Sequence, residues 1–107
     1  MYYTDFVAVK RIALLDDGSA GPVTTLTTQL TFFDDLYVDD EAIFVANYLF
    51  GSVEALTSAG TDVLDTAAFT FSGPSSVLPA KGRLGFSQTD YLVTEKTANQ
   101  LSVFHAR

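Results

Sequence analysis

Cysteine is absent from this chain of 107 residues, and its absence excludes two kinds of small-domain scaffold. Without thiols there is no disulfide framework and no cysteine-ligated zinc. Long apolar runs are also missing: residues 42–56 are the longest candidate, but they contain Asn47 and Glu54 and are too short to span a bilayer. Residues 1–11 lack a basic region followed by an apolar run, so we expect no signal peptide and a soluble protein made in the cytoplasm.

Lysine and arginine are scarce as well, with six of them against thirteen acids and a net charge of −7. None lies within residues 12–80, a stretch that contains ten acids. This deficit argues against nucleic-acid binding, which needs basic side chains to displace counterions from phosphates. The basic residues flank the acidic stretch, and complementary charges of this kind orient protein association. We expect protein partners, own copies included, with plain solubility as the alternative explanation of the layout.

The apolar residues that are present predict one folded domain over residues 1–107, since 48% of the chain is hydrophobic and 13% is aromatic. Two runs joined by a turn-rich segment at 16–22 predict an antiparallel hairpin. Alternating or β-branched stretches predict three further strands. The five predicted strands are 6–15, 23–33, 62–72, 90–96 and 100–105.

Residues 39–58 are the best helix candidate in the sequence. On a helical wheel, apolar side chains gather opposite a polar stripe that includes Asn47 and Glu54. Asp39 or Asp40 is a suitable N-cap, and strand remains the open alternative for 42–50. Residues 73–85, rich in proline and glycine, predict a long loop. The expected fold class is α+β or mainly β: one antiparallel sheet of about five strands with a single helix.

The run DDLYVDDE at 34–41 concentrates five carboxylates in eight positions. An EF-hand loop needs glycine at its sixth position, where this run has Asp39. A different calcium site, built from Asp34, Asp35 and Asp39, stays open as an alternative. The preferred interpretation is a turn followed by a helix cap, where the helix dipole favours negative charge. We therefore predict no metal and no cofactor.

Catalytic signatures are weak throughout the sequence. The single histidine, His105, lies close to the C-terminus, and no serine lies in a G-x-S-x-G context. Asp65 is the one carboxylate that shares a predicted strand face with aromatic residues, which leaves a small α+β enzyme as an alternative. We predict no catalytic residues and no enzymatic activity.

The preferred function is a structural or decoration subunit of a symmetric assembly, with a phage virion (capsid or head–tail region) as its setting after synthesis in the host cytoplasm. We expect a homo-oligomer that contacts its own copies or a shell protein through its loop, termini and complementary charges. A small-ligand or peptide-binding module, with a pocket of Phe44, Tyr48 and Phe50, is the other alternative. The predicted partner-binding residues are Lys81, Arg83, Arg107, Asp34, Asp35, Asp39, Asp40 and Glu41.

Overall fold

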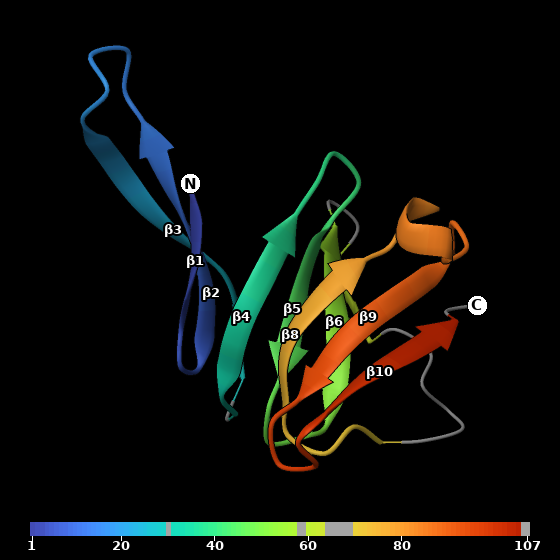
Figure 1. Ribbon diagram of the computed structural model, residues 1–107. Coiled ribbons are helices and arrows are strands. Elements are labelled where there is room, and N and C mark those ends of the chain that lie inside the picture. Colours follow the sequence, from blue (N-terminus) through green and yellow to red (C-terminus); the bar gives the residue numbers. More distant parts are fainter. Residues whose placement is uncertain (30, 58–59, 64–69, 106–107) are drawn as a thin grey trace.

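The computed structural model describes residues 1–29, 31–57 and 70–105, together with the backbone of 60–63. Over these residues the chain forms ten strands and one short 3-10 helix, η1 (Figure 1). No helix there has the length or apolar character to cross a membrane. The elements are β1 (Tyr2–Asp5), β2 (Ala8–Leu14), β3 (Ala20–Thr28), β4 (Phe33–Val38), β5 (Ile43–Asn47), β6 (Ser52–Thr57), β7 (Gly60–Val63), β8 (Pro74–Pro79), η1 (Arg83–Gly85), β9 (Asp90–Glu95) and β10 (Gln100–His105).

The strands form three antiparallel sheets in place of the predicted single sheet of five. Their orders are β1–β2–β3, β4–β5–β6–β7 and β10–β9–β8. The prediction of a mainly β chain is confirmed. The hairpin prediction is also confirmed, since β2 pairs with β3, and the last two predicted strands correspond closely to β9 and β10. Most of the predicted strand at 62–72 lies outside the described residues.

The β4–β7 sheet is the middle of three layers, because each of its faces packs on another sheet. Neighbouring residues of β5 alternate between the two packed faces, so all five of its side chains are buried. One cluster lies against the β8–β10 sheet and consists of Ala42, Phe44, Val53, Ala55, Phe71, Val77, Val93 and Phe104. The other lies against the base of the β1–β3 sheet and consists of Val9, Phe33, Ile43, Val45 and Leu56.

The predicted helix at 39–58 is wrong: this segment is the hairpin of β5 and β6. A strand covered on both faces carries apolar side chains on both, so it shows no period of two to distinguish it from a buried helix. Gly51 marks the true turn. Its φ is +65°, and an added Cβ would lie 2.3 Å from the carbonyl oxygen of Phe71. A glycine inside a helix is also unfavourable, so its presence favoured the turn.

The polar stripe that favoured a helix is a buried hydrogen-bond network across this hairpin. Glu54 is 2% exposed and accepts hydrogen bonds from Asn47 Nδ2 (2.8 Å) and Gln29 Nε2 (2.8 Å). Asn47 Oδ1 accepts from the Thr31 hydroxyl and from the backbone amide of Phe50. The network therefore fixes the segment after β3 to the middle sheet, with amides rather than a cation opposite the carboxylate.

The predicted loop at 73–85 is also wrong over half of its length, because 74–79 form β8. Pro74 and Pro79 are the first and last residues of this strand. β8 is the edge of its sheet and bonds only to β9, and an edge strand tolerates residues without an N–H. Proline content alone therefore did not distinguish an edge strand from a loop.

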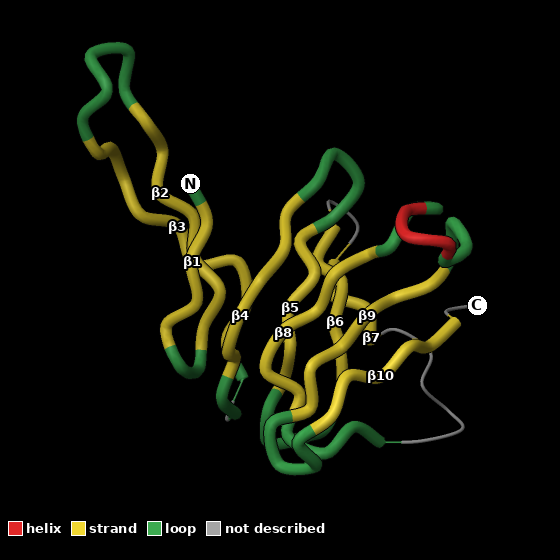
Figure 2. Tube along the Cα trace, in the orientation of Figure 1, coloured by secondary structure: helices red, strands yellow, loops and turns green. Residues whose placement is uncertain are grey.

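The outer part of the β2–β3 hairpin projects away from the three layers as an arm (Figures 1 and 2). We call residues 12–23 the distal arm. β1 pairs with residues 8–11, and Met1 adds hydrogen bonds to the backbone of Ile12, so beyond Ile12 the distal arm has two strands instead of three. Every residue in it is exposed apart from the half-buried Ile12 and Gly21. The radius of gyration is 14.3 Å, above the value of about 13 Å expected for a compact chain of this length.

Candidate functional site

The five acids of the 34–41 run do not converge on one point. Asp34 and Asp35 lie near the start of β4, where the pairing with β5 is irregular, and Asp39 lies beyond its end. At about 3.3 Å per residue, the strand separates the two groups by roughly 16 Å, so Asp34, Asp35 and Asp39 do not share a cation. Across the described residues, no three acidic or histidine side chains are placed to hold a metal ion.

Asp39 organises the connection between β4 and β5. Its Oδ1 accepts hydrogen bonds from the backbone amides of Glu41 (2.8 Å) and Ala42 (3.1 Å), and its Oδ2 lies 2.8 Å from Lys81 Nζ. Burial of Asp39 favours its neutral form, but the Lys81 contact and the two amides outweigh it and hold the pKa of Asp39 below its ordinary value. The predicted helix cap is therefore wrong, and Asp39 instead holds the connection between two strands.

Lys81 and Asp39, both predicted to bind a partner, meet within one chain. Lys81 remains partly exposed, and its hydrogen bond to Asp39 raises its pKa. Asp34, Asp35, Asp40 and Glu41 are exposed. Arg107 lies outside the described residues, as does Asp65, the carboxylate of the enzyme alternative. Of the predicted basic residues that the structure describes, Arg83 faces solvent and forms no ion pair with a described acidic side chain.

The acidic turn also borders an open hollow of about 390 Å³. Arg11 and Tyr2 line it from the β1–β3 sheet, opposite Asp39, Asp40 and Glu41. The rest of its wall is mostly apolar and consists of Leu26, Val38, Ala42, Ile43, Leu56 and Thr57, so it is an amphipathic groove between two sheets. A basic side chain and an acidic turn thus already face the same space within the monomer.

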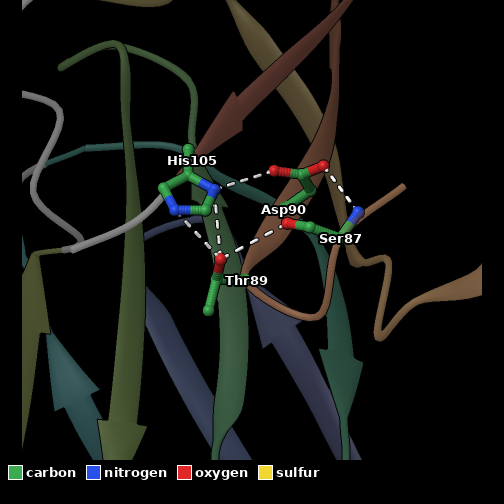
Figure 3. A network of polar contacts seen from close by, with 4 residues as sticks. All are labelled: Ser87, Thr89, Asp90 and His105. Atoms are coloured by element: carbon green, nitrogen blue, oxygen red, sulfur yellow. Dashed lines mark hydrogen bonds and ion pairs between the residues drawn. The ribbon is translucent and has the colours of Figure 1, made fainter.

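Figure 3 shows His105 beside Asp90, Thr89 and Ser87, an arrangement that resembles a catalytic triad in composition. His105 Nδ1 lies 3.0 Å from Asp90 Oδ1, but Thr89 Oγ1 lies 3.0 Å from Nδ1 and 3.1 Å from Nε2. The hydrogen-bonding directions of the two ring nitrogens diverge, so an oxygen nearly equidistant from both nitrogens is not aligned with Nε2 as a nucleophile requires. The His105 side chain is also 67% exposed. This network is a strand-end contact, and the hydrogen bond from His105 is the main cause that lowers the pKa of Asp90.

The aromatic residues of the ligand-binding alternative do not form one pocket. Phe44 is buried in the core between two sheets, and Phe50 is exposed in the β5–β6 turn. Tyr48 lines a shallow hollow of about 350 Å³ with other residues, among them Phe6, Phe32 and Lys96. Core packing thus accounts for Phe44.

Two of the exposed apolar surfaces on the described residues take no part in the core clusters. The first is the distal arm, with Leu14, Leu15 and Val23 exposed. The second is the outer face of the β8–β10 sheet, where Val103 and Leu101 are exposed and a hollow of about 410 Å³ is lined by Leu78, Leu84 and Leu92, among others. Exposed apolar groups that cluster in this way mark interaction sites. The apolar residues that flank the 16–22 turn are visible in the sequence and could have indicated the arm. The outer face could be recognised only once the pairing register of β8, β9 and β10 was known.

No protein-family model matches this chain, and neither a curated protein nor a solved structure shows significant similarity to it.

Proposed function

We propose that this chain is a non-enzymatic structural subunit that assembles with its own copies through the distal arm. The observation that carries the proposal is the exposure of the arm, which places apolar side chains in solvent on a hairpin of only two strands. An isolated two-stranded hairpin is at best marginally stable in water, because it buries little apolar area. Contact with a neighbouring molecule would supply the missing burial.

The charge layout supports the same proposal. The arm carries Asp16 and Asp17 at its tip, and no Lys or Arg follows until Lys81. A neighbouring copy offers basic groups outside this acidic stretch, so opposite charges orient the contact. The phage virion that we propose as the setting, whether capsid or head–tail region, is supported by sequence properties only: small size, β-rich character and no cysteine. Recovery of the chain in purified particles of defined mass tests that setting.

Sedimentation equilibrium over a wide concentration range tests the assembly itself. We expect the full chain to associate reversibly into species larger than the monomer. A shortened variant provides the comparison: residues 13–22 are replaced by Asn-Gly, which closes a two-residue turn between the paired residues Ile12 and Val23. This variant should remain monomeric while its thermal unfolding shows that the three layers are intact. A full chain that stays monomeric at high concentration, without any partner, would overturn the proposal.

A further inference from the structure

The outer face of the β8–β10 sheet carries an apolar row that crosses all three strands. The register pairs Leu78 with Leu92 and Leu92 with Val103, so these three side chains lie side by side. Their neighbours in sequence, Val77, Val93 and Phe104, point into the core. Val103 is 46% exposed and Leu101, two residues earlier on β10, is 62% exposed. Apolar residues thus occupy both faces of a sheet whose outer face no described element covers.

The η1 turn places an exposed apolar side chain, Leu84, and a positive charge, Arg83, at the edge of this row. Leu84 is 88% exposed and lines the hollow of about 410 Å³ together with Leu78, Leu92 and Arg83. The Arg83 side chain is held in place because Nε donates to the carbonyl of Ala80 (3.2 Å) and Nη2 to that of Pro79 (3.3 Å). A guanidinium has five N–H donors, so donors remain for an acidic partner.

The distal arm matches this surface in chemistry. Leu14, Leu15 and Val23 supply apolar side chains, and Asp16 and Asp17 at the tip supply negative charge, with Lys10 and Arg11 placed before the arm begins. Within one chain the two surfaces are apart: the arm projects from one side of the molecule, and β10 and η1 lie on the other (Figure 1). The arm of one copy therefore reaches this surface only on a second copy.

We propose that the outer face of the β8–β10 sheet is the docking site for the distal arm of a second copy, with Asp16 or Asp17 beside Arg83. This inference rests on the proposed self-assembly and specifies which two surfaces meet in it. Each copy uses a different surface for each neighbour, so the contact is head-to-tail and generates a ring or a filament.

Mixing two variants tests the docking. The arm variant carries Leu14→Ser and Leu15→Ser, and the face variant carries Leu84→Ser and Leu101→Ser; all four side chains are exposed, so both variants should fold. Each variant alone should be monomeric at concentrations where the unmodified chain assembles, because its dissociation constant for self-association should rise at least about tenfold. An equimolar mixture should form a one-to-one dimer by native mass spectrometry, because it retains one intact arm and one intact face. The matched control, Leu49→Ser with Phe50→Ser in the β5–β6 turn, should assemble like the unmodified chain.

Charge reversal tests the proposed pair. Arg83→Glu, or Asp16→Lys with Asp17→Lys, should weaken assembly by about two- to fivefold, as expected for an exposed ion pair, and less at high salt. The two reversed chains mixed together should recover part of the lost affinity through one restored interface.

The outcomes separate this docking site from self-assembly in general. If the face variant assembles like the unmodified chain while the arm variant does not, the arm docks elsewhere: the inference is overturned and the proposed function survives. A mixture without a dimer, from variants that are each monomeric, also overturns the head-to-tail contact. A strictly monomeric unmodified chain overturns both.

Discussion

Strand β5 and the distal arm are both apolar stretches, yet their surroundings are opposite. All five side chains of β5 are buried, whereas the arm exposes nearly all of its residues. Residue type does not explain the difference, because Leu14 and Leu15 are as hydrophobic as the residues of β5. The difference is the number of layers: β5 has a sheet on each face, and the distal arm has none. The apolar side chains of β5 thus pack in the core, whereas those of the arm, by our proposal, contact a second copy of the chain.

The largest expected effect that tests this contrast is on stability. Phe44→Ala should lower the free energy of unfolding by about 3–5 kcal/mol, because it leaves a cavity between the β4–β7 and β8–β10 sheets. Leu15→Ala in the arm is the control and should change it by less than about 0.5 kcal/mol at concentrations where the chain is monomeric. Urea unfolding of the two variants measures both values. A small loss for Phe44→Ala would contradict the buried position of this ring.

A second, smaller effect is expected at the network that joins the layers. Asn47→Ala should lower the free energy of unfolding by about 1–3 kcal/mol, since it removes one of the two donors to the buried Glu54 and the acceptor of the buried Thr31 hydroxyl. Gln88→Ala, at an exposed amide, should have little effect. Thermal and urea unfolding give the comparison. Equal losses in the two variants would show that the Asn47 network does not stabilise the packing of the layers.

The ion pair of Asp39 and Lys81 should make stability depend on pH. The pKa of Asp39 is lowered by folding, so the pair stabilises the fold above the unfolded pKa of about 4 and loses this contribution as pH falls through the folded value. The difference in unfolding free energy between the unmodified chain and Asp39→Asn should therefore shrink from neutral pH to about pH 3. Asp40→Asn, at an exposed neighbour, is the control. A difference that stays constant with pH would contradict the ion pair.

The least invasive comparison is hydrogen exchange without mutation. Backbone amides of residues 12–23 should exchange much faster than those of β5 in dilute solution, because an exposed two-stranded hairpin opens without unfolding the layers. Raising the protein concentration should slow exchange in the arm and leave β5 unchanged, if the arm docks on another copy. Arm protection equal to that of β5 in dilute solution would remove the contrast between the two regions.

Much of the β structure could be predicted from local pattern. The turn at 16–22 and its flanks gave the β2–β3 hairpin, and alternation gave β9 and β10. The hairpin of β5 and β6 was missed because burial on both faces removes the alternation, and the seven-residue spacing of Asn47 and Glu54 imitates a helical stripe. Strand β8 was missed because its two prolines resemble loop residues. Each error concerns a segment whose local sequence is compatible with two structures.

The candidate surfaces, too, could be predicted from the sequence only in part. Charge segregation is a property of the sequence, and it predicted that basic residues would meet acids. Only the tertiary structure placed Lys81 against Asp39 of the same chain and left Arg83 beside exposed leucines. The apolar row of Leu78, Leu92 and Val103 depends on the register of three strands, which the sequence does not specify locally.

By itself, therefore, the sequence determined composition, charge layout, the absence of disulfides and the β2–β3 hairpin, since these depend on residue type or on neighbours along the chain. The tertiary structure decided which strands share a sheet, which apolar segments are covered and which acids come near a base. Those outcomes depend on contacts between residues far apart in sequence. For DDLYVDDE, the consequence is that its acids lie at the two ends of one strand: Asp39 supports a turn, and the others remain in solvent.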